Sequence, residues 1–260
     1  MKRLVGKLKG GKASPVRSQL LEDLILRLHQ DVILSDPAPF EETLRRVKEY
    51  VHNSRGLTLA EVISTVPSSD ERGMSLLLRA LEDCHFSRAK ALVEAGIITN
   101  SISTDTRQCA LHFLIASIPR RLKETSEEGY QEAWEEIVFL LSACAEQATA
   151  TAGSPAAARR ATRGVGVNWP DLFKRTPLHL ATELGLNNVV KWLLNNGAEP
   201  SPVGPKRQTP LYMAAAAGHV EIAKVLLRSG ASTVLEVSAG SRRERLERQA
   251  PSGSRFALLT

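Results

Sequence analysis

The stretches RTPLHLATELG (175–185) and QTPLYMAAAAG (208–218) are two versions of one phrase. In and after them, five residues return unchanged 33 positions later along the chain. These pairs are Thr176 and Thr209, Pro177 and Pro210, Ala181 and Ala214, Gly185 and Gly218, and Gly197 and Gly230. A constant interval held at five positions indicates an internal structural repeat.

The residue types in each copy predict a helix, a turn, a second helix and an extended loop. Thr176 supplies a side-chain oxygen for a helix N-cap, and Pro177 suits the first helical turn, where its missing N–H is not needed. Gly185 permits a tight turn, and Gly197 permits a positive φ at the end of the second helix. Between them, the apolar residues of NNVVKWLLNNGA (187–198) fall on one helix face.

These residues resemble the ankyrin repeat family, whose period of 33 residues and T-P-L-H-x-A signature are both present. The resemblance implies an all-α helical solenoid with a concave face and protruding loops. It also implies that His179, the signature histidine, makes a structural hydrogen bond between neighbouring loops.

Two earlier copies are degenerate but keep the register. In SLLLRALEDCHFSRAKALVEAG (75–96), Ser75 takes the place of Thr and Cys84 that of the turn glycine. The next copy opens at CALHFLIAS (109–117), and its second helix is predicted at 131–146 from apolar residues spaced along one face.

That second copy is too long by about 34 residues before Gly164 restores the register. We expect the extra residues to form two solvent loops, at about 119–130 and 148–163. The whole stack, of about four repeats, is predicted to span 74–235. In the loop 197–209, three prolines predict an irregular finger instead of a regular two-stranded hairpin.

The ends of the chain lie outside the clear repeats. Residues 18–66 are predicted to form a helical N-terminal cap, with helices in 18–34 and 39–53 and a third short one near 58–65. Residues 1–17 and 236–260 are predicted to be flexible basic tails.

Composition narrows the function classes. The chain has 260 residues and a net charge of +6, and the basic residues concentrate in 1–21, 151–176 and 241–260. No run of eighteen apolar residues predicts a membrane span, and no signal peptide is indicated. Three widely spaced cysteines argue against a disulfide framework, so a cytoplasmic or nuclear location is expected.

The basic segments leave a second function open. Clustered Lys and Arg in 1–17, 159–163 and 242–255 favour binding to nucleic acid or an anionic membrane surface as an alternative. The first of these segments is also open to interpretation as a solvated tail or a mitochondrial transit peptide.

Catalysis has little support in the sequence. No nucleotide-binding, serine-hydrolase or zinc-protease motif occurs, and Cys84-His85 with Cys109 and His112 lacks the paired spacing of a zinc site. We therefore expect no enzyme activity, no cofactor and no metal. An enzyme with its catalytic part outside the repeats would depend on His52 or His85.

The expected function is that of a protein-interaction module or scaffold, and its oligomeric state is left open. By the resemblance, partner-contacting residues are those at the loop tips and on the first helices. Trp169 and Phe173 either anchor a partner or pack on the helices beneath, and Tyr212 either faces the groove or replaces a loop contact. The predicted partner-binding residues are Asp105, Arg107, Trp169, Leu172, Phe173, Lys174, Arg175, Lys206, Arg207, Gln208 and Tyr212.

Overall fold

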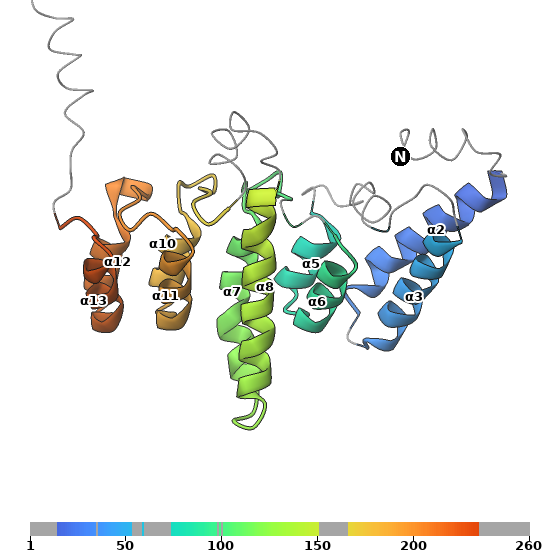
Figure 1. The fold of residues 1–260 in the computed structure, drawn as a ribbon, viewed down its shortest axis with the longest axis horizontal. Coiled ribbons are helices and arrows are strands. Elements are labelled where there is room, and N and C mark those ends of the chain that lie inside the picture. Colours follow the sequence, from blue (N-terminus) through green and yellow to red (C-terminus); the bar gives the residue numbers. More distant parts are fainter. Residues whose placement is uncertain are drawn as a thin grey trace, which may run out of the picture.

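The computed structural model describes residues 15–34, 36–53, 59, 74–97, 99, 101–150 and 166–233 (Figure 1). Its described residues form helices, so the expected all-α repeat solenoid is confirmed. The helices are α2 (Pro15–Asp31), α3 (Ala38–His52), α5 (Leu76–Glu82), α6 (Phe86–Glu94), α7 (Ala110–Glu124), α8 (Tyr130–Ala150), α10 (Pro177–Glu183), α11 (Asn187–Asn195), the 3-10 helix η1 (Pro205–Arg207), α12 (Pro210–Ala216) and α13 (Val220–Arg228).

The two clear repeats fold as their residue types predict. Thr176 and Thr209 are the N-caps of α10 and α12, and a proline begins each helix. The turn glycines Gly185 and Gly218 have φ of +71° and +73°. These values lie in the left-handed region that glycine enters without steric cost.

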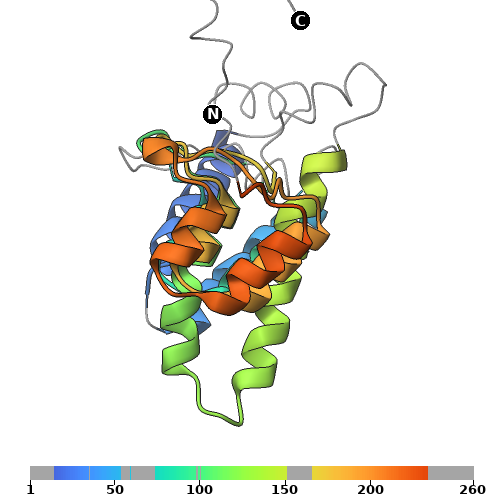
Figure 2. The same ribbon diagram turned by 90° about the vertical axis from the view of Figure 1, so that its left-hand side faces the viewer.

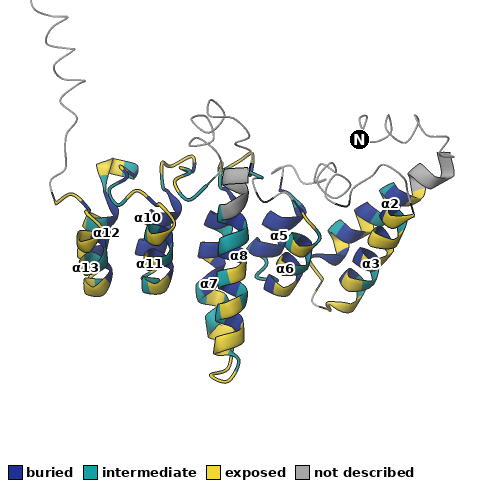
Figure 3. Cartoon of the chain, in the orientation of Figure 1, coloured by how far each residue is buried: buried dark blue, intermediate teal, exposed yellow. Residues whose placement is uncertain are grey.

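The helix pairs stand side by side in a row (Figure 1). The first helices α5, α7, α10 and α12 pack on one another in sequence, as do the second helices α6 with α8 and α11 with α13. One continuous apolar core runs through the row, from Leu28 in the N-terminal pair to Ala231 after α13. Residues coloured as buried accordingly occur in each helix pair of the row (Figure 3). The row is thus held by burial of apolar surface between neighbouring pairs.

The degenerate first repeat, α5 and α6, keeps the predicted register. Ser75 caps α5, its hydroxyl accepting from the N–H of Leu78 at 3.3 Å. Cys84 stands at the turn with φ of +62°, where the clear repeats have glycine. The turn geometry therefore persists without the residue that adopts it most easily.

The second repeat differs from the expectation. Residues 119–124 were expected in a solvent loop, and this is wrong, because they continue α7 to Glu124. Helices α7 and α8 contain 15 and 21 residues, against 7 and 9 in the pair α10 and α11. They form a hairpin that projects beyond its neighbours (Figure 1). Of the other expected loop, 148–150 belong to α8, which is a further difference, and 151–163 lies outside the described residues.

The N-terminal pair, α2 and α3, corresponds to the two helices expected in the cap. Residues 15–17 were expected in the flexible tail, and this is wrong, because α2 begins at Pro15. Arg88 of α6 joins this pair to the stack, because its Nη1 donates to main-chain oxygens at the end of α2: Val32 at 2.7 Å, Asp31 at 3.4 Å, and Leu34. The predicted third helix falls outside the described residues except for Leu59, which packs on the core.

The domain boundaries remain predictions. No helix in the described ranges combines the length and apolarity needed to cross a membrane.

Candidate protein-binding surface

Three loops precede the first helices, and we call them fingers: finger 1 is 101–109, finger 2 is 166–176 and finger 3 is 198–209. Their tips lie on the same side as the first helices when the stack is viewed end on (Figure 2). A main-chain hydrogen bond closes each tip, from Ser103 to Gln108, from Asp171 to Arg175 and from Gly204 to Gln208, at 2.8–3.0 Å. The irregular finger 3 expected from its prolines is confirmed, because its tip is the 3-10 helix η1.

Buried histidines fix the fingers to the first helices. The N–H of Thr176 donates to Nδ1 of His179 at 3.1 Å, so Nε2 carries the proton and donates to the main-chain oxygen of Gln208 at 3.2 Å. Burial lowers the pKa of His179, which keeps the imidazole neutral. The predicted structural role of His179 is confirmed.

His112 repeats this arrangement one repeat earlier. Its Nε2 lies 3.0 Å from the main-chain oxygen of Arg175, and Cys109 replaces the N-cap threonine at 3.1 Å from Nδ1. Burial also lowers the pKa of His112. Fingers 2 and 3 are therefore each tied to the preceding helix pair.

Finger 3 also depends on a close approach to His179. A Cβ added to Gly204 would lie 2.5 Å from Nε2 of His179, closer than real Cβ atoms come. Only glycine lets the main chain pass at this place without a shift.

The Asp171 carboxylate organises finger 2. It is fully buried and accepts hydrogen bonds from the N–H groups of Phe173 and Arg175, both at 2.8 Å. The Arg175 guanidinium adds two contacts at 3.0 Å. Much of Arg175 is thus engaged in holding the loop, and its Cζ also lies 5.4 Å from the centre of the Phe173 ring.

Fingers 1 and 2 contact each other directly. The N–H of Leu172 donates to the oxygen of Thr106 at 2.8 Å, and the indole N–H of Trp169 donates to the oxygen of Arg107 at 3.0 Å. The Arg107 guanidinium lies 5.7 Å from the Trp169 ring centre. Trp169 therefore bridges two fingers while part of its surface stays accessible.

Most of the predicted contact residues are exposed to solvent. Leu172 and Phe173 are each 56% exposed and Tyr212 is 51% exposed. Trp169, Arg175 and Gln208 are partly buried, whereas the remaining five predicted residues are exposed: Asp105, Arg107, Lys174, Lys206 and Arg207. The structure brings these residues to one side of the stack, and their contact with a partner stays a prediction.

Sequence reasoning missed Val203 in finger 3, which is as exposed as Phe173. Pro202 and Pro205 on either side of it were interpreted only as a sign of irregular backbone. An apolar residue between two prolines in a finger could have indicated an exposed apolar side chain.

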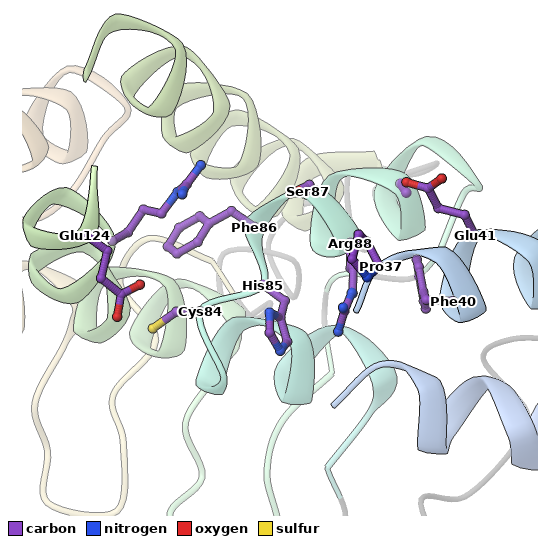
Figure 4. A pocket seen from close by; sticks show the side chains of 11 residues that line it. Pro37, Phe40, Glu41, Cys84, His85, Phe86, Ser87, Arg88 and Glu124 are labelled. Atoms are coloured by element: carbon purple, nitrogen blue, oxygen red, sulfur yellow. The ribbon is translucent and has the colours of Figure 1, made fainter. Parts of the chain in front are cut away.

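A separate cavity of about 290 Å³ lies where the N-terminal pair meets the first repeat (Figure 4). Its walls come from α3, from the turn 84–88 and from Arg121 and Glu124 of α7. His85 lies here, with its pKa lowered chiefly by burial, and burial raises the pKa of the Cys84 thiol. The two acids in the wall, Glu41 and Glu124, oppose its two arginines, so the lining favours no charged ligand.

Catalysis, metal binding or binding to an anionic surface would depend on residues other than those of the fingers. His52 is exposed at the end of α3. Within the ranges that the structure describes, no three His, Cys, Asp or Glu residues gather as a metal site would need. The basic segments 1–14, 159–163 and 242–255 lie outside those ranges, so the nucleic-acid or membrane alternative stays a prediction.

Comparison with known protein families gives one match on this chain: residues 142–236 match the family described as ankyrin repeats, in three copies. The match includes the end of α8 and all of α10 to α13, whereas α5, α6, α7 and the first part of α8 precede it. Comparison with curated proteins gives no significant match.

Proposed function

Because residues 142–236 carry ankyrin repeats, and such repeats generally mediate protein–protein interaction, we propose that this chain is a non-catalytic binding module. It holds a partner protein against the finger tips and the adjoining face of the first helices. The partner is recognised by shape and side-chain complementarity, with no chemical turnover.

The observation that carries this proposal is the pair Leu172 and Phe173 at the tip of finger 2. Both expose more than half of their surface, although the loop that bears them is held by the buried Asp171 carboxylate and by His112. An apolar tip on a loop fixed in advance loses little conformational entropy on binding. Apolar and aromatic residues of this kind supply anchors in protein interfaces.

The first helices extend this surface. Phe113 and Met213, both partly buried, hold the same place in the repeat register, four residues after their N-caps, on α7 and α12. Leu180 at this place on α10 is buried. Tyr212 beside Met213 is half exposed. A partner lying across the fingers therefore meets apolar surface of Phe113, Tyr212 and Met213 next to the tips.

The test is affinity capture with the full chain and with the double variant Leu172→Ser, Phe173→Ser. The matched control is Tyr130→Ser, Phe139→Ser, which removes two exposed apolar side chains from the hairpin α7–α8. A specific partner held by the unchanged chain and by the hairpin variant, but lost by the finger variant at unchanged helicity, is the expected result. Equal retention by both variants would show that the partner binds elsewhere.

A further inference from the structure

One register position at the finger tips combines an unfavourable backbone conformation with positive charge. Arg107, Lys174 and Arg207 each stand two residues before an N-cap, and their φ values are +55°, +64° and +63°. The main-chain N–H of each donates to a carbonyl three or four residues earlier, which closes the turn. The residue at this position therefore closes the turn in all three fingers.

Glycine is the residue that this position favours on physical grounds. A side chain in the left-handed region is destabilising, because its Cβ clashes with the main chain. The same register position holds Gly73 before the first repeat and Gly240 after the last, both outside the described residues. The three fingers that lie between these two glycines carry a cation at this position. The backbone conformation there does not require a charged side chain.

The three side chains are available to a ligand. All are exposed, and no described residue forms an ion pair with any of them. Finger 3 adds a further exposed cation, Lys206, which also has a positive φ of +53°. Leu172, Phe173 and Val203 expose apolar surface among these charges.

We propose that the fingers bind an acidic, extended segment of the partner protein, one carboxylate to the cation of each finger. This inference rests on the proposed function. Packed helix layers lie about 8–10 Å apart, and a segment in the polyproline II conformation advances about 3.1 Å per residue with three residues per turn, so that every third side chain points to the same side. A segment running along the row therefore brings every third residue to a finger, and apolar residues between the acids meet the apolar side chains.

The surface fits an acidic protein segment better than a nucleic acid. Asp105 is exposed at the tip of finger 1, and Glu183 at the end of α10. These carboxylates repel a continuous phosphate backbone, whereas an acidic side chain on every third residue of a peptide can avoid them. The exposed aliphatic side chains Leu172 and Val203 offer burial to apolar residues of a peptide.

The test measures stability and binding on the same full-length variants, Arg107→Gly, Lys174→Gly, Arg207→Gly and the triple. The probe is a labelled peptide of about 12 residues, Glu-Leu-Ser repeated, with Gln-Leu-Ser as its uncharged counterpart. At low ionic strength we expect the Glu peptide to bind about thirty times more tightly than the Gln peptide. Each single change weakens binding of the Glu peptide about threefold, and the triple about thirtyfold.

Stability moves in the opposite direction, and this separates a binding role from a structural one. Each glycine raises the melting temperature by about 2 °C, because backbone strain is relieved. Cys84→Gly is the matched control: Cys84 has the same positive φ but lies in a helix turn away from the fingers. It raises the melting temperature and leaves the affinity for the Glu peptide within about twofold.

Three outcomes overturn the inference. One is a triple variant that binds the Glu peptide as tightly as the unchanged chain, and another is no binding of the Glu peptide at all. The third is a thymidine oligonucleotide that binds more tightly than the Glu peptide and is lost in the triple variant. If the Gln peptide binds equally well and the Leu172→Ser, Phe173→Ser variant loses it, the acidic partner is wrong while the proposed function stands.

Discussion

The Nε2 atom of His179 lies 3.2 Å from the main-chain oxygen of Gln208, so a buried imidazole in one repeat holds the finger that leads into the next. His112 makes the same contact with Arg175 at 3.0 Å. The last repeat has Tyr212 at this place. The finger surface is therefore built on buried hydrogen bonds that cross from repeat to repeat.

Replacing His179 by leucine removes both contacts of the ring. The main-chain N–H of Thr176 then loses its acceptor, and the oxygen of Gln208 keeps only the N–H of Gly204. A buried group left without its partner costs about 1–3 kcal/mol. We expect the free energy of unfolding to fall by about 2–4 kcal/mol in urea denaturation. His219→Leu is the control, because His219 lies at the start of α13 and not in a finger. A similar loss of stability in this variant would contradict the role of His179.

Stability should fall as the pH falls from about 7 to about 5. Burial lowers the pKa of His112 and His179 below the ordinary value of 6.5, so in this window the unfolded chain binds protons that the folded chain does not. Stability is fully present above about pH 6.5 and is lost as the pH drops towards the folded pKa values.

Urea unfolding across this pH range measures the effect. The variant His112→Gln, His179→Gln should be less stable at neutral pH but show a shallower slope. A slope of the opposite sign in the unchanged chain would contradict neutral, buried imidazoles.

Asp171→Ala should disorganise finger 2. The change removes the acceptor of two main-chain N–H groups and leaves Arg175 without its buried partner, a loss of about 3–5 kcal/mol for pairs of this kind. Asp105→Ala, in an exposed position, should cost less than about 1 kcal/mol. Thermal unfolding measures the loss of stability in each variant. Equal losses would show that the buried Asp171 carboxylate stabilises the protein no more than the exposed Asp105 does.

Arg88→Met should loosen the N-terminal pair from the stack. The methionine keeps an apolar stem but cannot donate to the carbonyls at the end of α2, so we expect a loss of about 2–3 kcal/mol. Hydrogen exchange should speed up in α2 and α3 before it does in α10 to α13. Arg45→Met is the control, since the ion pairs of Arg45 are on the surface and worth little.

The sequence was sufficient for the repeat architecture because local rules act there. Thr176, Pro177 and Gly185 each favour one backbone conformation, and the interval of 33 repeats that choice. The projecting hairpin escaped because Pro119 suggests a helix end, although the helix continues past it. Ile115, Ile118 and Leu122 lie on one face of a helix, and this spacing was the available signal.

The roles within the fingers depend on contacts that no spacing reveals. Arg175 was expected to face a partner, yet its guanidinium pairs with the buried Asp171 carboxylate. Trp169 was expected either as an anchor or as packing on the helices; it does pack on the apolar core, and its indole N–H also joins fingers 1 and 2. The left-handed backbone at Arg107, Lys174 and Arg207 was also not read from the residue types, because cations do not favour it.

Hydrogen–deuterium exchange of the full chain, with and without its captured partner, tests the central claim most directly. We expect slower exchange in the partner complex at the main-chain amides of 103–108, 171–175 and 204–208, with α11 and α13 unchanged. Slower exchange confined to α11, α13 or the hairpin α7–α8, with the fingers unchanged, would contradict binding through the finger tips.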